Sequence, residues 1–290
     1  MINFKHYPGD AFKLYEDAVK GKRDKDGKEC LQLIHDEVEK AYAEYDTAFG
    51  LKAVHSLMPS SSFSGLDREN LLALYGSDKK IVKTVRAWID TNNKRTYLKV
   101  CPYCTLGVAN TTEHILPKAL YQEYAVHAKN FIPCCSDCNS RKGNAVRDAK
   151  GEPVVINFYY DTLPLVQYLF VDISFDANDI VNFTYSLDNV NNVDGKLFRL
   201  VQGHFTRLDL LNRFKTMAVS RYTELEDSLL VDLESKNIDD CMTDLKKKAL
   251  KDAAEYGRNH WMVVLKLALA ESGEYKKYII EKRKKTKSVE

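Results

Sequence analysis

The chain has 290 residues, of which 44% are hydrophobic and 11% aromatic, so it is long and apolar enough to bury a core in one large domain or two smaller ones. Its formal net charge of +2 is too small to indicate an anionic partner. Evidence for such a partner must come from local clusters of basic residues. No run of about 18 apolar residues is present to span a bilayer. The first residues, MINFKHYPGD, lack the apolar segment of a signal peptide. We therefore expect a cytoplasmic protein with no membrane partner.

Residues 1–96 predict a helical region. A first helix follows Asp10, a candidate N-cap, and a longer helix with one apolar stripe is expected over 31–45. Shorter amphipathic helices are expected over 67–74 and 81–89. We interpret the region as a scaffold. The alternative, contact with nucleic acid or a partner, would depend on its basic side chains, which are Lys79, Lys80, Lys83, Arg86, Lys94 and Arg95.

Two CxxC pairs predict a structural metal site. Cys101 and Cys104 form the first pair, and Cys135 and Cys138 form the second. Four thiolates at this spacing form a closed tetrahedral zinc cage with Zn–S bonds of about 2.3 Å, which leaves no position for a catalytic water. A redox dithiol or a chance pairing is the less favoured alternative. Cys134 breaks the spacing, and we interpret it as a neighbour of the cage rather than a ligand.

A second motif lies between and after the two cysteine pairs. Its residues are Glu113, His114, Pro117, Lys118, Asn130, Asn139, Arg141, Lys142 and Gly143. Together with the cysteines, this order over residues 101–144 resembles the HNH endonuclease family, also called ββα-metal or His-Me finger nucleases. The resemblance implies a central finger of two strands and a helix, stapled by the four-cysteine zinc site. It also implies an enzyme that hydrolyses phosphodiester bonds.

The resemblance further implies a role for each matched residue. His114 would be the general base, because an imidazole that is neutral at cellular pH can take a proton from the attacking water. Glu113 and Asn139 would bind the catalytic divalent ion, and Asn130 would brace the loop that presents His114. The family pattern usually has Asp at the first ligand position and His at the last. Oxygen donors at both positions favour Mg²⁺ or Mn²⁺ over zinc.

Three basic residues are expected to contact nucleic acid. Arg141 and Lys142 would lie in the first turn of a helix opened by Asn139, where the positive helix end attracts phosphate. Lys142 is also counted among the catalytic residues. Lys118 is interpreted as a further contact to the nucleic-acid backbone, with simple exposure as the alternative. His127 has no place in the motif and is expected only to pack.

Residues 151–290 predict strands followed by helices. Segments rich in β-branched and aromatic residues are expected to be extended and to close onto the finger, and these are 154–160, 168–175 and 181–188. Apolar periodicity predicts helices over about 206–233, 245–253 and 258–270. The basic C-terminal EKRKKTK is expected to be mobile, either as a nucleic-acid anchor or as a solubilising tail.

The sequence thus predicts an α+β, mostly helical protein with a helical region (1–96), a nuclease finger (97–150) and a mixed region (151–290). The leading hypothesis is a metal-dependent endonuclease, with DNA favoured and RNA such as tRNA left open. The alternative is a non-catalytic, zinc-stapled module that binds nucleic acid or protein. The layout is similar to the HNH effectors of anti-phage defence systems such as Septu and its retron-linked relatives, which implies an ATPase partner. Sequence preference and oligomeric state do not follow from the sequence.

Overall fold

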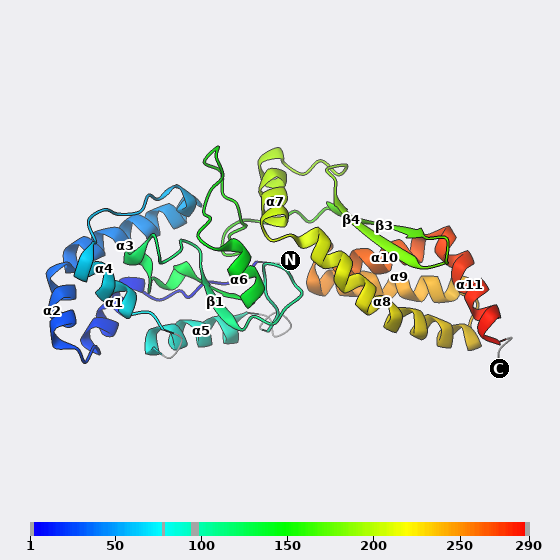
Figure 1. The fold of residues 1–290 in the computed structure, drawn as a ribbon, viewed down its shortest axis with the longest axis horizontal. Helices are drawn as coiled ribbons and strands as arrows, with labels where there is room; N and C mark the ends of the chain where they lie inside the picture. Colours follow the sequence, from blue (N-terminus) through cyan, green and yellow to red (C-terminus); the bar gives the residue numbers. More distant parts are fainter. Residues whose placement is uncertain (1–2, 77–78, 94–98, 288–290) are drawn as a thin grey trace. The chain divides into compact units, whose positions relative to one another are not determined.

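The computed structural model describes residues 3–76, 79–93 and 99–287. The chain folds as two compact units, one built from residues 3–162 and the other from residue 163 onward (Figure 1). Within the described ranges, no helix is both long and apolar enough to cross a membrane. The three regions expected from the sequence divide the chain by function, and that division remains a prediction. Lys94 and Arg95 lie outside the described residues.

The first unit begins with helices, which are α1 (Ala11–Lys20), α2 (Lys25–Leu33), α3 (His35–Gly50), α4 (Gly65–Ala73) and α5 (Lys80–Asn92), with a short 3₁₀ turn η1 (Val54–Ser56) after α3. Asp10 caps α1 as expected, because its side chain accepts a hydrogen bond from the amide of Lys13. The single helix predicted over 31–45 is wrong. The backbone leaves helical geometry at Ile34 (φ −100°, ψ 15°), which separates α2 from α3.

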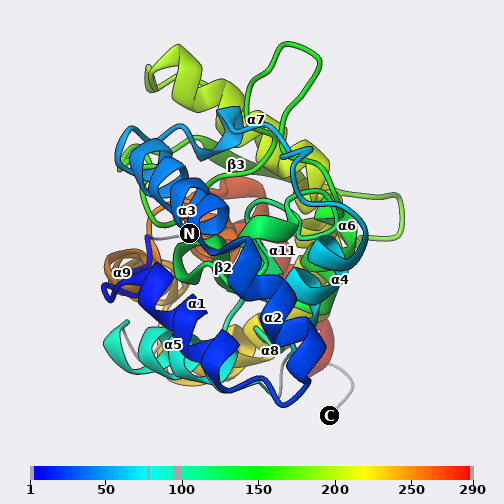
Figure 2. The same cartoon turned by 90° about the vertical axis from the view of Figure 1, so that its left-hand side faces the viewer.

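Helices α1 to α5 of the first unit lie around β2 (Figure 2) and contribute side chains to one apolar core. Its fully buried members include one residue from each of α1 to α5, which are Tyr15, Leu31, Val38, Leu71 and Val85. Phe131 and the loop residues Val126 and Ala128 belong to the same core. The helical region therefore supports the segment that carries the predicted motif, which is consistent with its interpretation as a scaffold.

The centre of the first unit is a two-stranded antiparallel hairpin followed by a helix. Strand β1 (Thr111–His114) pairs with β2 (Phe131–Cys134), and α6 (Ser136–Lys142) follows β2 directly. Two 3₁₀ turns lie in the loop between the strands, η2 (Gln122–Tyr124) and η3 (Ala128–Asn130). The expectation that Asn139 opens the helix is wrong, because α6 begins at Ser136. Arg141 and Lys142 consequently lie in its last turn rather than its first.

The second unit contains a hairpin of β3 (Leu169–Phe175) and β4 (Val181–Leu187), followed by α7 (Gly195–Arg207), α8 (Leu210–Ser235), α9 (Ile238–Tyr256), α10 (Trp261–Glu271) and α11 (Gly273–Lys287). The hairpin packs against α8 and α10. Of the three predicted extended segments, 168–175 and 181–188 form strands, whereas residues 154–160 form none, and the three predicted helices are present. Helix α7 was not predicted, and Asp194 caps it by accepting from the amides of Lys196 and Leu197. The basic segment predicted to be mobile lies within α11 up to Lys287.

Candidate functional site

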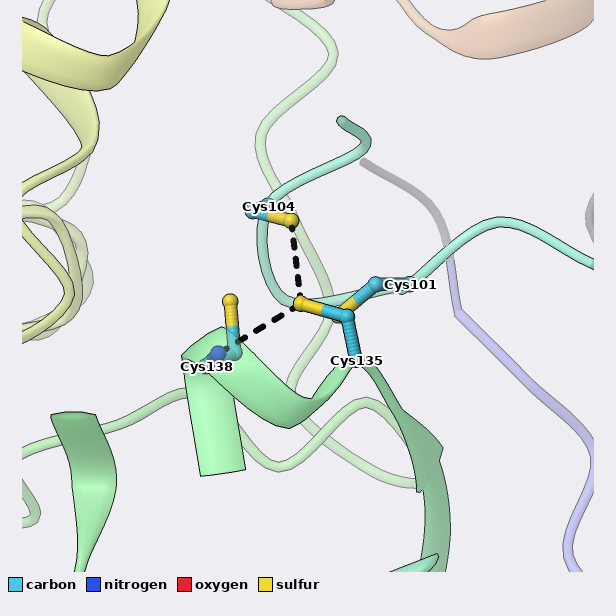
Figure 3. A group of neighbouring side chains, drawn as sticks. All are labelled: Cys101, Cys104, Cys135 and Cys138. Atoms are coloured by element: carbon cyan, nitrogen blue, oxygen red, sulfur yellow. Dashed lines mark hydrogen bonds between the residues drawn. The ribbon is translucent and has the colours of Figure 1, made fainter. Parts of the chain in front are cut away.

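Four buried cysteines, Cys101, Cys104, Cys135 and Cys138, converge beside the start of α6 (Figure 3). Their sulfur atoms all lie within 4.8 Å of one another, and the sulfurs of Cys104 and Cys135 are 3.8 Å apart. A zinc tetrahedron with bonds of about 2.3 Å has sulfur–sulfur edges of about 3.8 Å. The predicted cysteine cluster is therefore present, and its donor set fits a single zinc ion.

The backbone around the cysteines is arranged to support negatively charged sulfur. The amide of Leu106 donates to Cys104 Sγ, and the amide of Cys138 donates to Cys135 Sγ, each over 3.4 Å. Gly107 passes close to the second pair, since a Cβ at this position would lie 3.1 Å from the Cβ of Cys135. These contacts explain locally why the two pairs fold into one cage.

Hydrogen bonds between the thiols shift their pKa values in opposite directions. Hydrogen bonding with Cys104 lowers the pKa of the Cys101 thiol to about 4, and hydrogen bonding with Cys101 raises the pKa values of Cys104, Cys134 and Cys138. Cys134 lies 3.8 Å from Cys101, sulfur to sulfur, and donates to the carbonyl oxygen of Cys135. The lowered pKa of Cys101 favours the thiolate form that metal ligation requires.

His114 ends strand β1 and is almost fully buried, with 6% of its surface exposed. Its Nε2 lies 3.0 Å from the carbonyl oxygen of Ala125. Because a carbonyl only accepts, Nε2 carries the proton and Nδ1 keeps its lone pair. The imidazole packs edge-to-face against the rings of Tyr75 and Phe131. Burial lowers the pKa of His114 to about 4, so the ring is neutral at cellular pH.

Asn130 is fully buried and connects both ends of the loop between the strands. Its Oδ1 accepts from the amide of Leu116 over 2.8 Å, and its Nδ2 donates to the carbonyl oxygens of Leu116 and Tyr124, each over 3.0 Å. The hydroxyl of Tyr45 on α3 donates to the same Oδ1 over 3.3 Å. These bonds hold the loop whose residue Ala125 accepts from His114, which is the geometry of a brace.

Glu113 and Lys142 form a buried ion pair between β1 and the last turn of α6. The ammonium of Lys142 lies 2.7 Å from Glu113 Oε1 and also donates to the carbonyl oxygen of His114 over 2.9 Å. The Lys142 side chain is 0% exposed and that of Glu113 is 5% exposed. Burial raises the pKa of Glu113, and the charge of Lys142 opposes that rise. The ammonium therefore faces the protein interior. The predicted direct contact with phosphate would require it at the surface.

The two predicted ligands of a catalytic ion lie on the same face of β1. Asn139 on α6 donates from Nδ2 to Thr111 Oγ1 over 3.3 Å, and Thr111 and Glu113 alternate by two residues along the strand. A carboxylate and an amide oxygen are suitable donors for Mg²⁺ or Mn²⁺. However, the carboxylate is engaged by the Lys142 ammonium. With this pair formed, the residues do not fit a divalent ion.

The other two predicted nucleic-acid contacts reach the surface of the first unit. Lys118 is half-buried, and its ammonium lies 5.4 Å from the centre of the Tyr75 ring. Arg141 is exposed and pairs with Asp137 one helical turn earlier, with 3.1 Å between Nε and Oδ1. Their role in binding nucleic acid remains a prediction.

The chain is similar to the Septu protein PtuB of Bacillus thuringiensis. The two are 29% identical over 153 residues, which cover 51% of this chain and 50% of PtuB. The chain is also 25% identical to protein ea31 of Escherichia phage lambda over 126 residues, 43% of each protein. It thus spans about half the length of the curated relatives it matches. No family model and no solved structure matches.

Arg86 contributes to the site in a way that the sequence analysis did not anticipate. It was considered as a surface charge, but its guanidinium donates to the carbonyl oxygens of Ala109 and Thr111 and so fixes the start of β1 to α5. A signal was present in the sequence, because Arg86 borders the apolar face of its helix, four residues after Val82 and three before Ile89.

Proposed function

We propose that the chain is an HNH-type, metal-dependent endonuclease that hydrolyses phosphodiester bonds, with DNA as the favoured substrate and RNA such as tRNA as the alternative. The observation that carries this proposal is the environment of His114. Its Nε2–H is held by the carbonyl of Ala125, and its pKa of about 4 keeps the ring neutral. A fixed, neutral imidazole with a lone pair on Nδ1 is the form that a general base needs.

The surroundings of His114 support the same proposal. The order of β1, β2 and α6 supports the proposal of a ββα finger, and the four-cysteine cluster adjoins the start of the helix. Asn130 makes three hydrogen bonds to the loop that follows His114 and accepts a fourth from Tyr45 on α3. The structural zinc would keep this small element rigid, because a segment of this size has little core of its own.

In the proposed reaction, Nδ1 of His114 takes a proton from a water molecule as the water oxygen attacks phosphorus. The bond between phosphorus and the leaving 3′ oxygen breaks. Neutralisation of charge on the phosphate would need a divalent ion, Mg²⁺ or Mn²⁺, and Glu113 and Asn139 are its proposed ligands only where the ion pair with Lys142 is open. Lys118 and Arg141 would attract the polyanion from the surface.

We further propose a role in anti-phage defence, in the cytoplasm, together with an ATPase partner. The likeness to the Septu protein PtuB, at 29% identity, supports this proposal together with the layout seen in the sequence. The likeness covers about half of each protein. The ATPase partner is therefore proposed and does not follow from the likeness alone.

The experiment compares cleavage of plasmid, single-stranded DNA and tRNA with Mg²⁺, with Mn²⁺ and with EDTA. Removing a general base lowers rates by about 10²–10⁴-fold, so His114→Ala should lose cleavage. His127→Phe is the matched control, because His127 is also a buried histidine, packs against the rings of Tyr42 and Tyr45, and lies outside the motif. Equal cutting by the wild type and His114→Ala would falsify the role of His114. No cutting of any substrate would favour the zinc-stapled binding module instead.

A further inference from the structure

Two groups of basic side chains differ in whether the chain neutralises them. On α11, three lysines each pair with a carboxylate at 3.3 Å or less, and these are Lys276, Lys282 and Lys285. At the start of α5, three lysines are exposed and form no ion pair with any described residue, and these are Lys79, Lys80 and Lys83. The three charges on α11 are therefore balanced within the chain, whereas those of α5 remain available to an anionic partner.

The lysines of α5 lie between two side chains that contact strand β1. Arg86, which follows them on the same helix, donates to backbone carbonyls at the start of the strand. Tyr75, which precedes them, packs edge-to-face against His114 at the end of the strand, with 4.5 Å between the ring centres. The part of the chain that carries the lysines is thus held to both ends of β1 and lies close to the proposed base.

Lys118 approaches the same tyrosine from the loop that follows β1. Its ammonium lies 5.4 Å from the centre of the Tyr75 ring, and it too forms no ion pair among the described residues. Tyr75 is therefore followed in the chain by three exposed lysines and contacted in space by a fourth. Because Tyr75 is half-buried and covers part of His114, this positive charge borders the surface above the imidazole.

We propose that Lys79, Lys80, Lys83 and Lys118 form a basic surface that binds the sugar–phosphate backbone of nucleic acid and brings it to His114. Each ammonium that neutralises a phosphate releases a condensed counterion, so several unpaired lysines give binding that is sensitive to salt and independent of base sequence. The three lysines of α5 lie outside the nuclease motif. The inference rests on the proposed function for the identity of the polyanion.

The test measures binding of labelled DNA and RNA, each as a single strand and as a duplex of the same sequence, by fluorescence anisotropy. It uses the zinc-loaded full chain without Mg²⁺ or Mn²⁺. The triple variant Lys79→Gln, Lys80→Gln, Lys83→Gln should bind about tenfold more weakly at physiological salt, and the slope of log K against log salt should fall by about 3. Lys118→Gln should lower the slope by about 1. Since the contacts are to phosphate, the loss should appear with every probe that the wild type binds.

A second triple variant on α9, Lys246→Gln, Lys247→Gln, Lys248→Gln, is the matched control. These lysines are also exposed and consecutive, and their substitution changes the net charge by the same amount. Each of them, however, lies within 4.0 Å of a carboxylate of the chain. The control should therefore bind nucleic acid as tightly as the wild type.

The outcomes separate this surface from the proposed catalysis. Equal affinity of the α5 variant and the wild type, an equal loss in the α9 control, or no binding by the wild type overturns the inference. Binding that depends on the α5 lysines, without cleavage of any substrate, removes the proposed function and leaves the surface standing. Cleavage that depends on His114 and is unchanged by the α5 substitutions does the reverse.

Discussion

The two units differ in how they use buried polar side chains. Among the described residues, the unit of residues 3–162 buries eight polar or charged side chains, and the unit from residue 163 onward buries three. Seven of the eight lie within thirty residues of chain, and they are Glu113, His114, Gln122, Glu123, His127, Asn130 and Lys142. Burying such groups costs free energy unless each finds a partner. Their concentration in one segment agrees with the proposed site, whereas the second unit buries few such groups.

Loss of the metal cage should produce the largest difference in stability between the two units. We expect Cys138→Ala, or a zinc chelator, to destabilise the first unit by on the order of 5 kcal/mol, because a structural zinc contributes directly to folding. Hydrogen exchange should then increase across residues 99–143 and remain unchanged in α8 and α10. Cys241→Ala is the control, because Cys241 on α9 is equally buried but lies outside the cluster. Equal loss of protection in both units would show that the cage does not stabilise the first unit selectively.

A pair of buried asparagines offers the next comparison. Asn130 braces the loop of the first unit, and Asn259 does the same in the second, where it accepts from the amides of Tyr168 and Leu169 and donates to the carbonyl of Val166. Each Asn→Ala change should cost about 3 kcal/mol, since several buried backbone groups lose their partner.

Only Asn130→Ala should also reduce cleavage, by at least about 100-fold, because a small displacement of the loop misplaces the proposed base. Thermal unfolding and cleavage rates, measured on both variants, check this expectation. Comparable cleavage by the two variants would mean that Asn130 is a structural residue with no connection to the site.

The sequence predicted what depends on residue type and short spacing. The two CxxC pairs were recognisable because cysteine spacing alone limits how four sulfurs can meet. The pairing of Glu113 with Lys142 was not predictable in this way, because these residues lie far apart in the chain and meet only once helix α6 is placed. Moving the helix start from Asn139 to Ser136 transfers Lys142 from the first turn to the last. Because the helix begins three residues earlier than predicted, Lys142 lies in its last turn, where it is buried instead of exposed.

Glu123 should make the stability of the first unit depend on pH. Burial raises its pKa from the usual 4.5 to about 7, and only 1% of the residue is exposed. The folded chain thus binds this proton more tightly than the unfolded chain. The stabilisation that protonated Glu123 gives the folded state is therefore lost as pH rises from 4.5 through 7. Glu123→Gln should raise the free energy of unfolding by about 3 kcal/mol at pH 8 and leave it unchanged at pH 4. Parallel pH profiles for the variant and the wild type in urea unfolding would contradict this assignment.

The smallest effect is expected at the ion pair of the second unit. Glu226 accepts from Lys282 and also from the hydroxyls of Tyr222 and Tyr278, at 2.8 and 3.0 Å, and the Lys282 side chain is 39% exposed. Lys282→Met should therefore cost at most about 1 kcal/mol, the usual range for a solvent-screened pair. Lys142→Met should cost about 3 kcal/mol or more, because it leaves a buried carboxylate without its cation. Urea unfolding of both variants measures the difference. Equal costs would show that exposure does not separate the two pairs, and that the sealed pair at Glu113 is an ordinary structural contact.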